Sequence, residues 1–311
     1  MQTLEPLIVI LGTGGTIAGT ARSSCDGVGY TAAQLRVDDL LAAVPALAGR
    51  RLEAHQVAQL DSKDMDIATW QRLAIAVDEQ LARPEVAGVV VTHGTDTLEE
   101  TAYFLHRVLA PNKPVVLTAA MRPATALVPD GPQNLFDAVQ VAAKPGAAGV
   151  VVAFAGRVHD ATQVRKAHSY RVDAFESADG ALVARVEEGA VRLLGRWPAG
   201  EALGLARIAA PAGSWPRVDI VMNHAGADGR IVRALLAAGV DGIVAAGTGN
   251  GTLGVDLEHA LREAESRGVR IVRSTRCDAG PVMDLPGLLP SAGVLSPVKT
   301  RIELILALLA R

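Results

Sequence analysis

The segment LIVILGTGGTIAG, residues 7–19, joins a run of five apolar residues to a glycine-rich turn. An apolar run without alternation is typical of a parallel strand that helices cover on both faces. We therefore predict a first strand over residues 7–11, with the turn at its carboxyl end. Because ligands bind outside the carboxyl ends of strands in open parallel sheets, this turn is also the first candidate site.

The rest of the chain repeats the alternation of apolar runs and helical patterns. Further strands are predicted over residues 88–92, 114–118, 149–154, 218–222, 242–246 and 270–274. Amphipathic stretches lie between them: Trp70, Leu73 and Val77 share one helical face, and so do Leu98 and Leu105. This alternation predicts an α/β protein with parallel strands and right-handed crossovers.

Regular periodicity fades between residues 192 and 216, a stretch rich in glycine, proline and tryptophan. We therefore expect a larger N-terminal catalytic α/β domain over residues 1–191, with a mainly parallel sheet flanked by helices. A linker over residues 192–216 leads to a smaller C-terminal α/β domain over residues 217–311.

The composition limits the classes of partner. The net charge of the 311 residues is −3, and Lys and Arg are scattered rather than clustered, which argues against nucleic acid and anionic membranes as partners. The first apolar run is too short for a signal peptide, so we expect a cytoplasmic protein without a membrane span. Two cysteines, Cys25 and Cys277, form neither a disulfide framework nor a zinc site.

The first turn fits neither of the common nucleotide motifs. The dinucleotide spacing G-x-G-x-x-G fails because the sixth position from Gly12 is Ile17, and no lysine follows in the manner of a phosphate loop. One interpretation is a turn whose backbone amides approach a small ligand, with the hydroxyl of Thr16 at its exit. The other is a tight strand-to-helix turn with Thr16 as the helix cap.

A second polar segment, THGTDT at residues 92–97, follows another predicted strand. Thr97 precedes Leu-Glu-Glu and is expected to cap the next helix through its side chain, which leaves Thr95 and Asp96 to face a site. His93 is interpreted as structural, since no second histidine stands at metal-ligand spacing.

Together, TGGTIAG at 13–19 and HGTDT at 93–97 resemble the two signature segments of bacterial L-asparaginases and glutaminase-asparaginases, which are threonine-nucleophile amidohydrolases. The resemblance continues through LDSKDM at 60–65, AAMRP at 119–123, DGPQNL at 130–135 and GTGNG at 247–251. It implies the two-domain fold just described, no metal or organic cofactor, L-asparagine as the small-molecule substrate, and a homotetramer assembled as a dimer of dimers.

The resemblance also implies a set of catalytic residues. Thr16 corresponds to the nucleophile, with Tyr30 as its hydroxyl neighbour on a lid over residues 20–30. Thr95, Asp96 and Lys166 correspond to a second trio. A threonine hydroxyl needs a group that takes its proton, and a desolvated Lys166 beside Thr95 is expected to relay one.

The remaining implied residues bind the substrate. Ser62 and Asp96 are expected to hold its α-carboxylate and α-ammonium, and Ala120 to offer its backbone carbonyl to the side-chain amide. Asn250 is expected to reach the site from the adjacent subunit. The turns that contain Gly15 and Gly94, together with Thr95, are expected to supply backbone amides to the substrate and to the tetrahedral oxyanion.

These residues predict hydrolysis of L-asparagine to L-aspartate and ammonia through an acyl-threonine, with some L-glutamine hydrolysis. Two departures from the family bear on substrate range and mechanism: Lys63 stands where many relatives carry glutamine, and residues 277–284 lack the glutamate that some relatives supply. Lys63 is expected to swing away or to pair with an acid. A related amidotransferase subunit is disfavoured because it usually carries an added N-terminal domain, and the alternative from another class is an amino-acid-binding, catalytically degenerate family member.

Overall fold

The computed structural model describes residues 5–24, 29–177 and 181–310. The chain divides between Leu205 and Ala206 into two compact units, a point that lies within the stretch expected to be a linker. Within the expected lid, Cys25, Asp26 and Gly27 lie outside the described residues.

The N-terminal unit is built on an eight-stranded sheet in the order β10-β9-β6-β5-β4-β3-β1-β2. Strands β2, β1, β3, β4 and β5 are parallel, and β5, β6, β9 and β10 pair antiparallel. The strands span β1 (Leu7–Gly14), β2 (Leu52–Leu60), β3 (Val86–Thr92), β4 (Pro114–Thr118), β5 (Gly149–Phe154), β6 (Arg157–Asp160), β9 (Ala184–Glu187) and β10 (Ala190–Leu193). A separate pair, β7 (Val164–Lys166) and β8 (Phe175–Ser177), completes the unit.

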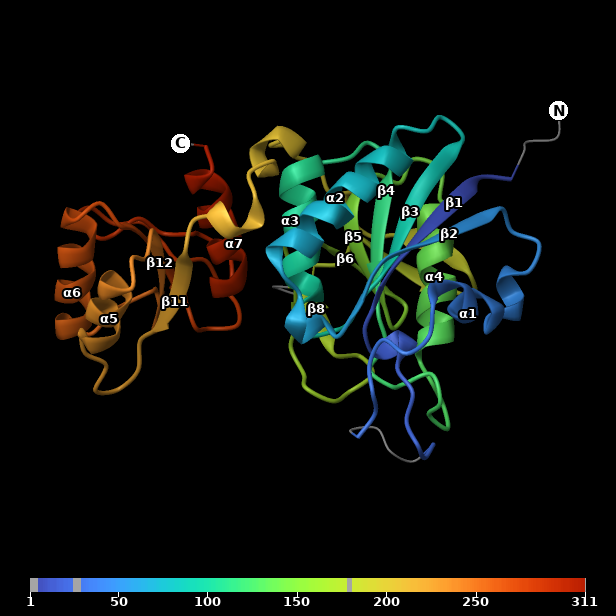
Figure 1. The fold of residues 1–311 in the computed structure, drawn as a ribbon, viewed down its shortest axis with the longest axis horizontal. Coiled ribbons are helices and arrows are strands. Elements are labelled where there is room, and N and C mark those ends of the chain that lie inside the picture. The colour runs from blue at the N-terminus through green and yellow to red at the C-terminus, as the bar shows by residue number, and fades with distance from the viewer. Residues whose placement is uncertain (1–4, 25–28, 178–180, 311) are drawn as a thin grey trace. The chain divides into compact units, whose positions relative to one another are not determined.

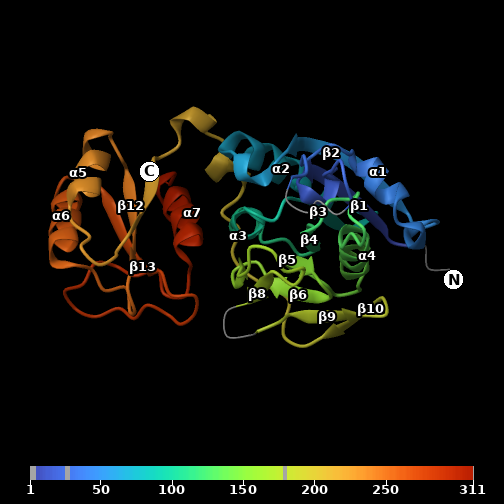
Figure 2. The ribbon, with the colours of Figure 1, turned by 90° about the horizontal axis from the view of Figure 1, so that it is seen from below.

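Helices cover both faces of this sheet (Figures 1 and 2). On one face α2 (Ile67–Leu81) packs against α3 (Leu98–Leu109), where the rings of Trp70 and Phe104 stack with their centroids 5.0 Å apart. On the other face α1 (Val37–Ala42) and α4 (Gly131–Ala142) share a core with Ile8, Ile10 and Val116. This double cover explains why the central strands are apolar without alternation.

The C-terminal unit repeats the layered plan on a smaller scale (Figure 2). Its parallel sheet has the order β11-β12-β13, with β11 (Val218–Met222), β12 (Gly242–Gly247) and β13 (Arg270–Thr275). Helices α5 (Arg230–Ala237) and α6 (Val255–Ser266) pack together, and α7 (Pro297–Leu308) contacts all three strands. The predicted fold class, two α/β parts of which the first carries the large sheet, is confirmed.

The predicted strands are all present, but the sequence pattern did not reveal the edge and antiparallel strands. Strand β2 is an edge strand with a half-exposed pattern, and β6 to β10 are three or four residues long. Such segments bury too few side chains to produce a continuous apolar run. Strand β10 continues to Leu193, two residues into the stretch expected to be a linker.

No helix among the described residues has the length and apolarity needed to cross a bilayer. The functional consequence of the topology lies at the carboxyl edge of the parallel strands. Four neighbouring strands, β2, β1, β3 and β4, end at this edge, and each is followed by one segment of the predicted site.

Candidate active site

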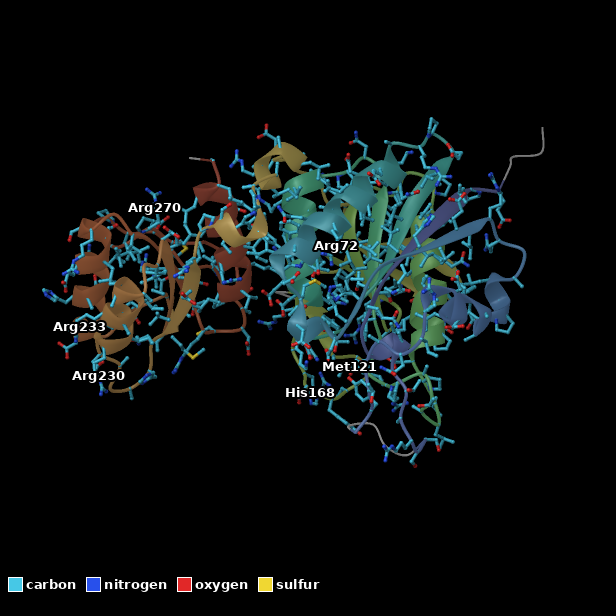
Figure 3. The ribbon with its side chains drawn as sticks, in the orientation of Figure 1. Arg72, Met121, His168, Arg230, Arg233 and Arg270 are labelled. Atoms are coloured by element: carbon cyan, nitrogen blue, oxygen red, sulfur yellow. The ribbon has the colours of Figure 1, made fainter. Side chains whose placement is uncertain are left out.

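The four parallel strands bring the predicted residues to one edge of the sheet. The turn after β1 contains Thr16 at the start of a 3-10 helix (Thr16–Ala18), and Ser62 begins another (Ser62–Asp64) after β2. Thr95 follows β3, and Ala120 follows β4. Figure 3 marks the same end of the unit through Met121, the neighbour of Ala120, and His168, which follows Lys166 by two residues.

The turns after β1 and β3 touch through their glycines. Gly15 adopts φ 80°, and a Cβ on it would lie 2.4 Å from the backbone Cα and N of Gly94. A Cβ on Gly94 would lie 2.4 Å from Oγ of Ser62. Side chains larger than hydrogen are therefore excluded at both positions, and the threonines that follow the two glycines are held on adjoining turns.

The backbone N–H of Gly15, expected to face a substrate, is bonded within the protein, and so is its carbonyl. Its N–H donates to the carbonyl of Leu60 at 2.9 Å, and its carbonyl accepts from Ala18 and Ala33. The contribution of Gly15 is thus the close approach of the two turns. The N–H of Thr16 opens the 3-10 helix, a position whose N–H has no partner within the helix.

Thr16 and Tyr30 form a close pair of hydroxyls. Their oxygens lie 2.6 Å apart, and either can donate the hydrogen bond. Burial raises the pKa of Tyr30 above 10.0; the Thr16 hydrogen bond lowers it, and the negative charges of Asp61 and Asp96 raise it further. Tyr30 is therefore a neutral phenol at neutral pH.

The segment expected to be a lid is fastened where it leaves and rejoins the unit. Thr20 and Thr31 form an antiparallel bridge, with both N–H···O distances 2.9 Å. The loop that follows Ala120 adds two bonds: Ala124 N–H donates to Gly19 O at 2.9 Å, and Ala21 N–H donates to Thr125 Oγ1 at 2.8 Å. These bonds hold the phenol of Tyr30 beside Thr16.

The second predicted trio is assembled as expected. Nζ of Lys166 donates to Oγ1 of Thr95 at 2.9 Å and to Oδ1 of Asp96 at 2.6 Å. The Lys166 side chain is 18% exposed, and that of Asp96 is 53% exposed. Glu99, which the sequence did not single out, accepts the backbone N–H of Lys166 at 3.1 Å and so ties strand β7 to helix α3. The amine faces both a carboxylate and a threonine hydroxyl.

Ser62 is joined to the second turn at two atoms. Its Oγ accepts the N–H of Asp96 at 3.1 Å, and its carbonyl accepts the hydroxyl of Thr97 at 2.7 Å. The prediction that the Thr97 side chain caps α3 is therefore wrong. Thr97 stands at the N-cap position without a capping bond, because its hydroxyl points to Ser62 instead.

Asp130 and Asn134 fix the loop after β4, and sequence reasoning gave neither a role. Asp130 accepts the N–H groups of Met121 and Arg122, both at 2.9 Å. Nδ2 of Asn134 donates to the carbonyl of Ala119 at 2.9 Å. Asp130 and Asn134 thus bond the backbone on both sides of the fully buried Ala120. Both residues belong to the DGPQNL segment, which was the only sequence feature that could have indicated them.

Lys63 pairs with acids, as expected. Its Nζ bonds the carboxylate of Asp64 and lies 3.9 Å from Asp61. The Asp64 hydrogen bond is the largest cause of the raised pKa of Lys63, which is exposed. The ion pair screens this cation, which remains exposed and close enough to Asp96 for their charges to interact.

Asn250 belongs to the C-terminal unit, where a turn after β12 holds it. Its Oδ1 accepts the N–H of Met283 at 2.7 Å, and its carbonyl accepts Nη1 of Arg273 at 3.1 Å. Arg273 is 3% exposed and also donates to the carbonyl of Leu289 at 2.7 Å. In the stretch that lacks the glutamate, Asp284 accepts the N–H of Ser291 at 3.0 Å.

His93 is fully buried, and burial lowers its pKa to about 4, so the imidazole is neutral at neutral pH. Among the described residues, no group of three or more His, Cys, Asp or Glu side chains is arranged to hold a metal ion. The arrangement thus offers two threonine hydroxyls on touching turns, each with its own proton-bearing neighbour. Such a pair suits nucleophilic attack on a carbonyl followed by hydrolysis.

The family comparisons agree with this geometry. Residues 7–198 match the family described as "Asparaginase, N-terminal", and residues 217–311 match the "Glutaminase/Asparaginase C-terminal domain". The chain is 38% identical to a "Probable L-asparaginase periplasmic" of Haemophilus influenzae, over 97% of this chain and 88% of the relative. It is 36% identical to a "Glutaminase-asparaginase" of Pseudomonas fluorescens, over 88% and 76%.

A solved structure, titled "Probable Cytoplasmic L-asparaginase" from Campylobacter jejuni, superimposes with a TM-score of 0.92 at 37% identity, covering 98% of this chain and 95% of that one. The matches extend over both units and include relatives named for asparagine alone and for glutamine as well. This chain therefore belongs to the asparaginase family.

Proposed function

We propose that this protein hydrolyses the side-chain amide of L-asparagine to L-aspartate and ammonia through an acyl-threonine intermediate on Thr16. The observation that carries the proposal is the meeting of two hydroxyl systems on touching turns. Thr16 lies 2.6 Å from Tyr30, and Thr95 lies 2.9 Å from the amine of Lys166. A binding pocket alone has no need of both threonines and the lysine.

Thr16 is the proposed nucleophile because it is buried, follows the glycine turn and contacts a neutral phenol. Tyr30 retains its own proton, so it serves as a relay: it accepts the proton of Thr16 as its own passes onward. The amide nitrogen takes up a proton and leaves as ammonia. Water then attacks the ester: its oxygen stays on the aspartate product, and one of its protons restores the hydroxyl of Thr16.

The second trio is proposed to orient Thr95 and to complete the proton path. Lys166 donates to a lone pair of Thr95 Oγ1, so the proton of that hydroxyl points away from the lysine. It can therefore reach the substrate amide or the attacking water. Asp96 keeps the amine in place at 2.6 Å.

The substrate's α-groups fit the polar atoms that remain. Ser62 Oγ already accepts from Asp96 N–H, so its own proton is available to donate to the α-carboxylate. The exposed carboxylate of Asp96 suits the α-ammonium. The N–H groups of Thr16 and Thr95 are proposed to hold the oxyanion, a role worth about 3–4 kcal/mol per donor.

Assembly is part of the proposal. We infer a dimer of dimers in which Asn250 completes the site of the adjacent subunit, and a cytoplasmic location. Met283, whose N–H bonds Asn250, has an exposed apolar side chain, as do Leu285 and Val294 of the same C-terminal segment. These side chains are suited to burial against a second copy. Light scattering at assay concentration tests the expected tetramer, and a monomer that turns over at full rate would contradict it.

Ammonia release from L-asparagine and from L-glutamine tests the activity. Wild type, Thr16→Val and Thr95→Val are compared with Thr300→Val, a matched control that removes a buried hydroxyl from α7. Asparagine hydrolysis is expected to fall by about a thousandfold or more in the first two variants, the scale found for lost nucleophiles and their partners. The glutamine rate measures the substrate range.

The alternative, an amino-acid-binding family member, gives a different pair of results. Aspartate or asparagine would raise the melting temperature by binding the native state. No ammonia would be released by the wild type. That combination would replace the hydrolase proposal.

A further inference from the structure

A chain of three buried side chains runs from helix α2 to the turn before Thr95. Nε1 of Trp70 donates to Oγ1 of Thr101 at 2.9 Å, and that oxygen lies 3.0 Å from Nε2 of His93. Nδ1 of His93 lies 2.7 Å from the carbonyl oxygen of Gly94. Trp70 is 6% exposed, and Thr101 and His93 are 0% exposed.

The two end groups of this series of hydrogen bonds, Trp70 and Gly94, determine which atom donates in each bond. The indole N–H of Trp70 can only donate, and the carbonyl of Gly94 can only accept. The neutral ring of His93 carries one proton, which must sit on Nδ1 to bond the carbonyl. Nε2 is then an acceptor, so the hydroxyl of Thr101 donates to it and accepts from the indole. All donors and acceptors match, with His93 as the Nδ1–H tautomer.

The last bond in the chain fixes a peptide group of the proposed site. The N–H and C=O of a trans peptide point in opposite directions, and the described residues contain no cis peptide. Holding the Gly94 carbonyl toward His93 therefore turns the N–H of Thr95 away from the core. Gly94 also lies against Gly15 and Ser62, and these contacts limit how far this peptide can rotate when the hydrogen bond to His93 is weakened.

We propose, resting on the proposed function, that Trp70, Thr101 and His93 form a relay of hydrogen bonds that positions the Gly94–Thr95 peptide for catalysis. His93 and Thr101 are positioning residues, since neither touches the reacting atoms. The relay fixes the orientation of the Thr95 N–H and the direction in which the Thr95 side chain points from the turn. It links the stacked pair of α2 and α3 to the active turn.

Two substitutions at Thr101 separate positioning from simple packing. Thr101→Val keeps the volume and loses the hydroxyl, whereas Thr101→Ser keeps the hydroxyl and loses a methyl group. We expect kcat for asparagine to fall by about tenfold to a hundredfold in the valine variant, the effect of small misplacement in an active site. The serine variant retains kcat within about threefold although its cavity destabilises it.

KM is expected to change little in either Thr101 variant, because Ser62 and Asp96 remain in place. Thr300→Val, whose lost hydroxyl donates to Ser296 O in the C-terminal unit, controls for burying a valine in place of a threonine. It should leave kcat unchanged. A purely packing role for Thr101 predicts the reverse order, with valine more active than serine, and would overturn the proposal.

NMR spectroscopy tests the relay without reference to activity. Long-range ¹H–¹⁵N spectra of ¹⁵N-histidine-labelled wild type, with His93→Asn used for assignment, should show His93 neutral and protonated at Nδ1 at pH 7. The amide resonance of Thr95 should shift in Thr101→Val and return in Thr101→Ser. An Nε2–H tautomer, or a Thr95 amide unmoved in the valine variant, would overturn the relay even in a protein that releases ammonia. The expected tautomer and amide shifts in a protein without turnover would sustain the relay and refute only the proposed function.

Discussion

The buried, neutral His93 gives this protein a calculable dependence of stability on pH. Its pKa is about 4 in the folded state against 6.5 for the unfolded reference. Below pH 6.5, His93 therefore binds a proton in the unfolded chain but stays unprotonated in the native state. The free energy of unfolding falls as the pH falls toward 4. At pH 5 the loss from this one residue, relative to pH 7.5, is about 2 kcal/mol.

His93→Asn removes the titrating ring but retains an amide N–H that can donate to Gly94 O. We expect the variant to be less stable than wild type at pH 7.5, because hydrogen bonds to the ring are lost. The difference in the free energy of unfolding between wild type and the variant should become smaller by about 2 kcal/mol at pH 5. Urea unfolding of both proteins at the two pH values, at one protein concentration, gives the double difference.

The double difference is needed because Asp137 acts in the opposite direction. Burial raises the pKa of this carboxyl to about 6, so its contribution to stability grows as the pH falls through 6. The wild-type profile alone would therefore hide the His93 contribution. His259→Asn, at an exposed position on α6, is the control and should leave the double difference near zero. Equal pH responses of wild type and His93→Asn would refute a buried neutral histidine.

Three further outcomes follow from named contacts. Gly94→Ala places a Cβ 2.4 Å from Ser62 Oγ and should lower stability by about 1–3 kcal/mol and ammonia release at least tenfold, measured by thermal unfolding and by assay; unchanged values would contradict the close approach. Lys63→Gln removes an exposed cation near the substrate's ammonium and should lower KM for asparagine by about threefold with kcat unchanged, and a raised KM would count against it. Arg273→Met leaves the buried carbonyl of Leu289 and the half-buried carbonyl of Asn250 without this donor and should cost about 2–4 kcal/mol in urea unfolding, whereas a neutral result would contradict this.

Long apolar runs and helical periodicity were enough to predict the fold class. Strand β4 was found at its predicted bounds, and β1 only continued from Leu11 to Gly14, because buried parallel strands have a strong signal. The edge strand β2 and the short strands after β5 had no such signal. Pairing across an edge depends on neighbours that lie far away in the sequence.

The motifs located the site better than they described its contacts. The pairs Thr16–Tyr30 and Thr95–Lys166 are 14 and 71 residues apart in the chain, and only the resemblance to a family connected them beforehand. The capping pattern misassigned Thr97, whose hydroxyl donates to the carbonyl of Ser62 instead of capping α3. The capping pattern is local, whereas the bond to Ser62 arises from the approach of two turns.

The positions of Asp130, Glu99 and Arg273 show a more general limit. Each acts by accepting or donating to the backbone of a remote loop, and a backbone group has no sequence signature. Such positioning residues become visible only when the loops are placed in space.

The most direct test of the account is the mass of tryptic peptides from enzyme that is acid-quenched during its first turnover of L-asparagine. Cleavage after Arg22, Arg72 and Arg107 places Thr16 and Thr95 on different peptides. We expect one aspartyl group, as an ester, on the peptide that contains Thr16, and none in Thr16→Val. An aspartyl group on the Thr95 peptide, or ammonia release by Thr16→Val at the wild-type rate, would contradict it.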